Sequence, residues 1–216
     1  MPANTKKRIL CFGDSNTWGY IPNTDHQRFD ENSRYPKVLQ KLLGEDYEII
    51  EEGLNSRTLK SEDLRPGKDN KNGSKHLIPC LEAHDPIDLI ILMIGINELK
   101  HSYQKTAYEA AQVFEDYYIK VILNRRSASE KIIPKILIVS TTKINESVNY
   151  AKERFLGGNK KSEQLSELYE NIANKYSCDF VSAIDLEIGE DGVHLTEKSH
   201  QILAQRLNQT IQSKKL

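Results

Sequence analysis

The stretch ILCFGDSNTWGY (residues 9–20) places a series of hydrogen-bonding side chains directly after an apolar segment. The apolar run stops at Gly13, and a carboxylate, a hydroxyl, an amide and a second hydroxyl follow before Trp18. A serine in this position has two uses. The Ser15 hydroxyl could cap a following helix, since Ser and Asp are favoured N-caps, or it could be presented as a nucleophile. The segment by itself leaves both interpretations open.

Two other short segments carry the groups that a nucleophilic serine needs. The segment DGVH places Asp191 three residues before His194, and a histidine held by an acid is the usual base for serine. In GINELK, the amide of Asn97 could donate a hydrogen bond to an oxyanion. Each pattern also has an ordinary explanation, because Asp-x-x-His occurs in solvated turns and Asn97 could close a turn with its own side chain.

The chain alternates between short apolar runs and helical patterns. The expected strands span 8–12, 47–52, 88–94, 135–140 and 179–183, and the expected helices span 34–44, 107–124, 161–176 and 197–212. Strands that are apolar at every position are typical of a parallel sheet covered on both faces. The alternation predicts one doubly wound α/β domain over residues 1–216, with residues 60–76 forming a long surface loop.

This topology predicts where the chemistry lies. Ligands of such sheets bind beyond the carboxyl ends of the strands. Four polar segments follow predicted strands, and their sequences are GDSNTWG, EGLNSRT, GINELK and GEDGVHLT. Together they supply a hydroxyl, an acid–histidine pair, a side-chain amide and several backbone N–H groups. Their coincidence at one edge of one sheet favours a hydrolytic serine site over unrelated turns.

These segments resemble the sequence blocks of the GDSL, or SGNH, hydrolases. FGDSNTWG resembles the first block, IGINE the Gly-x-Asn-Asp block and DGVH the Asp-x-x-His block. KRILCFGDSNTWGY, EIIEEGLNSRT, DLIILMIGIN and DGVHLTE read in the same order and spacing as the small arylesterase and acyltransferase branch. The resemblance runs nearly end to end. It implies a three-layer α/β/α sandwich with a five-stranded parallel sheet, the flavodoxin-like fold of these hydrolases.

The resemblance also implies a role for each block residue. Ser15 would be the nucleophile, His194 the base and Asp191 its partner. The oxyanion hole would use the backbone N–H groups of Ser15 and Ser56 and the side chain of Asn97. Two departures from the branch stand out. Ile96 and Glu98 flank Asn97 where the branch carries Thr and Asp, and Ser56 stands where the branch normally places Gly.

Three further residues are expected to bind substrate: Asp14, Trp18 and Asn55. Trp18 either lines the acyl pocket or is a core aromatic that holds the first turn. The resemblance suggests a short acyl group, an apolar leaving group, acyl transfer beside hydrolysis, and a homo-oligomer. Two alternatives stay open: a carbohydrate O-acetyl esterase with the same residues, and a non-enzymatic phosphate- or nucleotide-binding module at GDSNT. The chain has no Gly-x-Gly-x-x-Gly and no Gly-Lys-Ser/Thr loop, which counts against the second.

Composition and short motifs predict the protein's partners, location and cofactors. Thirty Lys and Arg against 31 Asp and Glu give a formal net charge of −1, with no basic stripe for nucleic acid or an anionic membrane. The start MPANTKKRIL shows no signal region, so we expect a cytoplasmic protein. The odd number of cysteines predicts free thiols, and the lack of His-x-x-x-His or Cys-x-x-Cys pairs predicts no metal or other cofactor. The five histidines other than His194 are expected to be structural or exposed.

Overall fold

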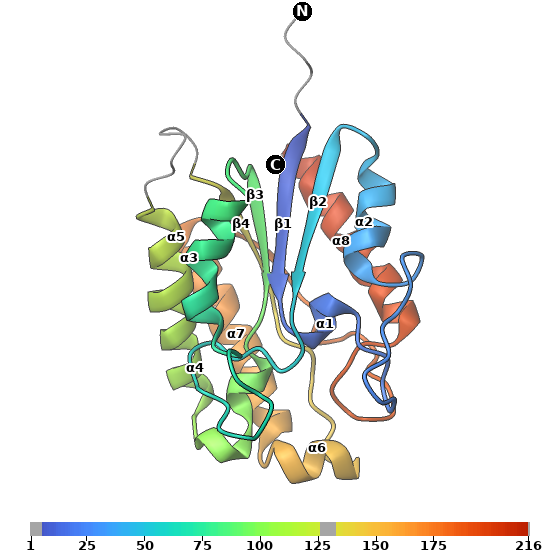
Figure 1. Ribbon diagram of the computed structural model, residues 1–216, viewed down its shortest axis with the longest axis vertical. Helices are drawn as coiled ribbons and strands as arrows, with labels where there is room; N and C mark the ends of the chain where they lie inside the picture. Colours follow the sequence, from blue (N-terminus) through green and yellow to red (C-terminus); the bar gives the residue numbers. More distant parts are fainter. Residues whose placement is uncertain (1–5, 126–132, 216) are drawn as a thin grey trace, which may run out of the picture.

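Five parallel strands form one sheet in the order β2-β1-β3-β4-β5 (Figure 1). The structure, a computed structural model, describes residues 6–125 and 133–215. The strands are β1 (Lys7–Gly13), β2 (Tyr47–Gly53), β3 (Leu89–Met93), β4 (Lys135–Val139) and β5 (Asp179–Val181). All five expected strands are confirmed, and the order places β1 and β3, the two strands followed by GDSNTWG and GINELK, side by side.

Helices connect the strands and cover both faces of the sheet. The α-helices are α1 (Ser15–Trp18), α2 (Tyr35–Leu43), α3 (Gly73–Ala83), α4 (Ala107–Phe114), α5 (Lys120–Leu123), α6 (Asn149–Arg154), α7 (Gly158–Tyr176) and α8 (Glu197–Lys214). Two short 3₁₀ helices are η1 (Ile96–Leu99) and η2 (His101–Tyr103), and a π-helical turn is η3 (Glu115–Ile119). The expected helices correspond to α2, the α4–α5 segment, α7 and α8, whereas α3 and α6 were not predicted.

One boundary of the predicted surface loop was wrong. Residues 60–76 were expected to lie outside regular structure, but α3 already begins at Gly73. The Asn72 side chain accepts a hydrogen bond from the backbone N–H of Ser74 and caps this helix. The preceding polar stretch runs into the cap without a change in composition, so hydrophobic periodicity could not locate the start.

The core has one apolar layer on each face of the sheet. α2 and α8 pack on one face, and α3, α4, α5 and α7 lie on the other (Figure 1). The five residues of β3 are all buried, because their side chains alternate between these two layers. This arrangement confirms the predicted three-layer α/β/α sandwich and the interpretation of continuous apolar runs as doubly covered strands.

Two glycines let α1 lie against the ends of two strands. Gly13 and Gly53 are partners in the register of β1 and β2. A Cβ atom at Gly13 would lie 2.0 Å from Thr17 Oγ1, and one at Gly53 would lie 2.2 Å from the backbone nitrogen of Trp18. Any larger residue at either position would push α1 away. The glycines therefore fix the position of Ser15 at the carboxyl edge of the sheet.

Two further expectations concern the cysteines and the membrane. The cysteines are free thiols, as predicted: Cys11 and Cys80 are buried and Cys178 is half-buried. Among residues 6–125 and 133–215, no helix has the length and apolarity to cross a bilayer.

Candidate active site

Ser15 is the first residue of α1, at the carboxyl end of β1. Figure 1 shows the strands pointing toward α1 and α6 at this end of the molecule. The helix cap is Asp14, not Ser15, because a carboxylate oxygen of Asp14 accepts the backbone N–H of Asn16 at 3.0 Å. The interpretation of Ser15 as a simple N-cap is therefore wrong. Its hydroxyl is available for another partner.

That partner is His194, from the loop between β5 and α8. Ser15 Oγ lies 2.8 Å from His194 Nε2, and His194 Nδ1 lies 2.6 Å from Asp191 Oδ2. All three residues are buried, with 4–5% of their surface exposed. The structure thus brings together three residues that the sequence separates by up to 179 positions. A hydroxyl, an imidazole and a carboxylate in this chain can move a proton from the hydroxyl to the imidazole.

The second oxygen of Asp191 fixes the turn that carries His194. Asp191 Oδ1 accepts the backbone N–H groups of Val193 at 2.9 Å and His194 at 3.0 Å. Burial opposes ionisation of Asp191, but the hydrogen bond and charge of His194 and these two N–H groups outweigh burial and hold its pKa below the usual range. Asp191 is therefore a carboxylate at neutral pH and can stabilise a charged imidazole.

Two residues that sequence reasoning missed also contact this pair of loops. Asn16 Oδ1 accepts the backbone N–H of Leu195 at 2.9 Å. The ring of Tyr20 lies 4.5 Å, centroid to centroid, from the ring of His194. Both residues stand in the segment around Ser15, but their contacts depend on a loop far away in the chain. No local pattern could have revealed them.

Ser56 and Asn97 line the same cavity as Ser15 and His194. Ser56 has a left-handed backbone with φ of 64°, a conformation that glycine adopts more readily than serine. A serine adopts this conformation at a cost of roughly 1–2 kcal/mol, and its backbone N–H is retained. Asn97 lies at the start of η1 and is 6% exposed. Its Nδ2 donates one hydrogen bond to Arg57 O at 3.1 Å, which leaves a second N–H for a ligand.

Arg57 joins the ends of β1 and β2 beneath the site. Its guanidinium donates to Gly13 O at 2.8 Å and to Glu52 O, and it lies 4.2 Å from the centroid of the Phe12 ring. Burial lowers the pKa of Arg57, although the charge of Glu52 counters the effect. The side chain thus ties the ends of β1 and β2 together, while the backbone oxygen of Arg57 accepts from Asn97. Sequence reasoning gave Arg57 no role.

Glu98, a departure from the family block, anchors a neighbouring segment. Its carboxylate is fully buried and accepts the backbone N–H groups of Leu59 at 2.9 Å and Lys60 at 3.2 Å. It also accepts the Ser61 hydroxyl at 2.7 Å and pairs with the ammonium of Lys105 at 3.2 Å. The longer glutamate side chain is thus fully bonded, and it connects the turn that carries Asn97 to residues 59–61.

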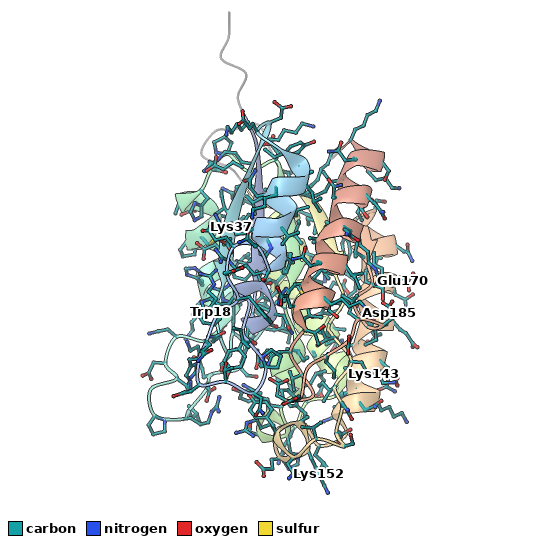
Figure 2. The ribbon with its side chains drawn as sticks, turned by 90° about the vertical axis from the view of Figure 1, so that its right-hand side faces the viewer. Trp18, Lys37, Lys143, Lys152, Glu170 and Asp185 are labelled. Atoms are coloured by element: carbon teal, nitrogen blue, oxygen red, sulfur yellow. The ribbon has the colours of Figure 1, made fainter. Side chains whose placement is uncertain are left out.

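The cavity over Ser15 has a volume of about 220 Å³. Asn55, one of the three residues expected to bind substrate, lines this cavity. Its Oδ1 is buried and has no hydrogen-bond partner in the described part of the chain. Asp14 and Trp18 do not line the cavity. Asp14 is buried, and the half-buried Trp18 ring, labelled in Figure 2, has the Arg28 guanidinium 5.3 Å from its centroid.

A larger cavity lies elsewhere on the molecule. It has a volume of about 1000 Å³, and its lining includes Lys143, Glu170 and Asp185, which Figure 2 labels. Neither Ser15 nor His194 contributes to it. Size alone therefore does not locate the chemistry, because the smaller cavity holds the reactive groups.

The other histidines fall into three environments. His200 is buried, accepts the backbone N–H of Tyr35 at 3.3 Å, and has a pKa lowered to about 3 by burial and the charge of His194. His101 is exposed, and the exposed His26 lines the cavity over Ser15. The remaining two, His76 and His84, contact a single carboxylate.

That carboxylate belongs to the group of described residues best placed to hold a metal ion. Glu52, His76 and Cys80 have ligand atoms within 4.8 Å of one another, and the Glu52 carboxylate also lies 3.1 Å from His84 Nε2. Burial and the charge of Glu52 raise the pKa of the Cys80 thiol to about 12. Hydrogen bonds among these side chains account for the group without an ion.

Comparison with known proteins gives a consistent result. The model of the GDSL-like lipase/acylhydrolase family matches residues 11–202. No curated protein sequence matches the chain. A carbohydrate acetylesterase from Sinorhizobium meliloti is 32% identical with a TM-score of 0.88, over 96% of this chain and 99% of that chain. An aryl esterase from M. smegmatis is 33% identical with a TM-score of 0.87, again over 96% and 99%. A putative arylesterase from Agrobacterium tumefaciens is 26% identical with a TM-score of 0.85, over the same shares.

Proposed function

The chain belongs to the GDSL-like lipase/acylhydrolase family and is a carboxylic ester hydrolase; from this premise we propose that it is a serine esterase that acts through an acyl-enzyme on Ser15. One observation carries the proposal. The Ser15 hydroxyl, the His194 imidazole and the Asp191 carboxylate form one hydrogen-bonded chain, with distances of 2.8 Å and 2.6 Å. Because the chain belongs to a family of acylhydrolases, we do not retain the alternative of a non-enzymatic nucleotide-binding module.

The proposed first step is attack on the ester carbonyl. His194 Nε2 takes the proton from Ser15 Oγ while this oxygen bonds to the carbonyl carbon. Asp191 holds the imidazole through Nδ1 and stabilises its positive charge. His194 then donates the proton to the departing alkoxide or aryloxide. The product of this step is an acyl group on Ser15.

The developing oxyanion needs hydrogen-bond donors near Ser15. The proposed donors are the backbone N–H groups of Ser15 and Ser56 and the free N–H of Asn97 Nδ2. The positions of Ser56 and Asn97 in the lining of one cavity with Ser15 support this assignment. Donors that are held in place before the reaction stabilise the transition state without reorganisation.

Water, activated by His194, would release the acyl group in the second step. A second alcohol in the place of water would give acyl transfer, which is the activity that the arylesterase resemblance suggests. The cavity of about 220 Å³ supports a short acyl group. A carbohydrate O-acetyl esterase is the second candidate, because a carbohydrate acetylesterase from Sinorhizobium meliloti is 32% identical over nearly the whole chain. Parallel assays of aryl acetates and acetylated glycans separate the two.

The experiment that tests the proposal is covalent labelling during turnover of an aryl acetate. An organophosphonate should inactivate the enzyme and add once, with peptide mapping placing the adduct on Ser15. The Ser15→Ala and His194→Ala variants should stay folded and lose hydrolysis. Ser102→Ala, at an exposed serine, is the matched control and should keep both labelling and activity. Labelling at another residue, or full activity of Ser15→Ala, would refute the assignment.

Oligomeric state and cellular location stay predictions from the sequence. We propose a homo-oligomer, supported by the resemblance to the arylesterase branch, and light scattering of the purified protein tests it. We also propose a cytoplasmic location and neither nucleic acid nor a membrane as partner, supported by the near-zero net charge. Fractionation of cells that express the chain checks the location.

A further inference from the structure

The cavity over Ser15 is strongly cationic. Four basic side chains line it, and no carboxylate among the described residues does so: the basic residues are Arg65, Lys68, Lys100 and Arg154. They come from three separate parts of the fold, namely the loop that precedes α3, the end of η1 and the end of α6. An ordinary aryl or alkyl acetate contains no group that would use these charges.

Lys100 is the most informative of the four. It is only 9% exposed, yet its ammonium has no hydrogen bond or ion pair with any residue that the structure describes. Burial lowers its pKa to about 8, and the Arg65 charge adds to this effect, while Asp63 and Asp14 oppose it. An ammonium in the wall of this cavity, largely withdrawn from water and without a carboxylate partner, is disfavoured in its charged form. An anionic group in the cavity would remove this penalty.

Of the other three cations, Arg65 and Arg154 have carboxylate partners, and Lys68 adds to the unpaired charge of Lys100. Arg65 is neutralised by Asp63, which accepts from its Nε at 2.8 Å. Arg154 lies 4.0 Å from the centroid of the Tyr150 ring, donates to Tyr150 O at 3.2 Å and forms a surface ion pair with the Glu153 carboxylate at 3.4 Å. Lys68, like Lys100, has no ion pair among the described residues. The cavity therefore has a surplus of positive charge beside the reactive hydroxyl.

We propose that this esterase acts on esters that carry an anionic group, a carboxylate or a phosphate, and that Lys100 binds this group together with Lys68 and Arg154. The inference rests on the proposed function and adds its substrate class. The ammonium of Lys100 would donate charge-assisted hydrogen bonds to the anion and hold the ester carbonyl near Ser15. Neutral esters would still react, but without this positioning.

The test compares esters of matched size that differ in charge. On the alcohol side, 4-acetoxybenzoate is compared with neutral 4-acetoxybenzamide, and 4-acetoxyphenyl phosphate tests a phosphate in the same position. On the acyl side, monoethyl glutarate is compared with ethyl 4-carbamoylbutyrate. One charge-assisted contact predicts that kcat/KM of an anionic ester exceeds that of its neutral counterpart by about 10- to 100-fold. Added salt should reduce this ratio.

Variants locate the effect. Lys100→Gln should remove most of the ratio with little change for the neutral esters, and Lys100→Arg should restore most of it. Arg154→Gln should remove part of the ratio and serves as a second variant if Lys100→Gln folds poorly. Lys152→Gln is the matched control on α6, because Lys152 is exposed and lies at the outer edge of this helix (Figure 2).

Three results would overturn the inference. Neutral and anionic esters could react equally well in the wild type, or Lys100→Gln could lower kcat equally for both, which would assign Lys100 to the oxyanion region. Both results leave the proposed esterase intact. If the protein hydrolysed none of these esters and the phosphonate did not label Ser15, the result would instead refute the proposed function together with this inference.

Discussion

Asn16 and Leu195 are joined by a hydrogen bond of 2.9 Å, although 179 residues separate them in the sequence. In the sequence, Asn16 is the residue after Ser15, and Leu195 is the residue after His194. This bond therefore ties the segment of the proposed nucleophile to the segment of the proposed base. Both groups are buried, so neither finds water if the other is lost.

Asn16→Ala should lower kcat by about 10- to 100-fold with little change in KM, because the imidazole loses its fixed position relative to the hydroxyl. The unpaired N–H of Leu195 should also lower the free energy of unfolding by about 1–3 kcal/mol. Steady-state kinetics and denaturant unfolding of the same preparation measure both effects.

Glu190→Ala is the control for this variant. It removes an exposed contact between the segment after α1 and the loop that carries His194, in which Asn23 Nδ2 donates to Glu190 Oε2 at 3.4 Å. Near-wild-type kinetics are expected. If both variants had the same kinetics, the buried bond of Asn16 would have no special effect on His194.

Asp191→Asn should reduce kcat by about 10⁴, the usual size of this change in a Ser-His-Asp site. The amide oxygen can still accept the N–H groups of Val193 and His194, so the turn should fold. Its NH₂ group, however, would face His194 Nδ1 and favour the wrong tautomer. Asp185→Asn, at an exposed carboxylate paired with Arg206, is the matched control. Retention of a tenth of the wild-type kcat by folded Asp191→Asn would remove Asp191 from the proposed mechanism.

Asn97→Ala should reduce kcat by about 10²–10³ with KM nearly unchanged, as expected on loss of one oxyanion donor. Glu98→Gln tests the adjacent position. It should affect stability more than kcat, because the Glu98 carboxylate holds the backbone of residues 59–61 rather than the cavity. Kinetics beside a thermal melt separate the two. An unstable but catalytically normal Asn97→Ala would show that Asn97 only closes a turn.

The preference for anionic esters should depend on pH through Lys100. Its pKa of about 8 means that the ammonium is charged below this pH and neutral above it. The charged groups that act on it are Arg65, Asp63, Asp14 and Arg154. The ratio of kcat/KM for the anionic ester to that for its neutral counterpart should therefore be high at about pH 6.5 and fall toward one at about pH 9.5.

Lys100→Arg supplies the control for the pH experiment, because a guanidinium keeps its charge over this range. The variant should show a ratio that does not change with pH. A constant ratio in the wild type would contradict a role of the Lys100 ammonium in substrate binding.

Acyl chain length should limit turnover. The cavity of about 220 Å³ is small beside common ligand pockets of roughly 300–1,000 Å³. For aryl esters, kcat/KM should fall by about 10- to 100-fold from acetate to octanoate, because each added methylene must displace packed side chains. Tyr150→Ala, at a half-exposed residue of the lining, should reduce this fall. Faster turnover of octanoate than of acetate by the wild type would contradict the expectation.

The sheet was predictable because its strands carry their signal locally. A run such as DLIILMI is apolar at every position only when both faces are covered, and the order of elements then requires parallel pairing. Ser15 and Asn97 could be identified because they stand shortly after β1 and β3, whereas Asp191 and His194 lie well beyond the end of β5 and were identified as the acid–histidine pair of DGVH.

Other parts of the site depend on contacts that no local pattern encodes. In the sequence, Arg57 cannot be distinguished from other polar loop residues. In the structure, its guanidinium donates a hydrogen bond to Gly13 O at the end of β1. The four cations of the cavity come from segments far apart in the chain, so their convergence is a property of the fold. Trp18 was expected either in the acyl pocket or in the core, and it lies beside Arg28 outside the cavity lining.

Hydrogen bonds join the two ends of the loop before α3, so the loop can vary without disturbing the rest of the fold. Thr58 N–H donates to Lys71 O at 2.9 Å, and Gly73 N–H donates to Thr58 O at 3.1 Å, so the two ends of the loop meet. Glu98 holds the chain just inside this junction. Since the ends are fixed from outside, residues 62–70 can change in sequence or length at little cost in stability. This segment carries Arg65 and Lys68. Replacing it by recombination or directed evolution would therefore change the preference for charged substrates while Asn97 stays in place.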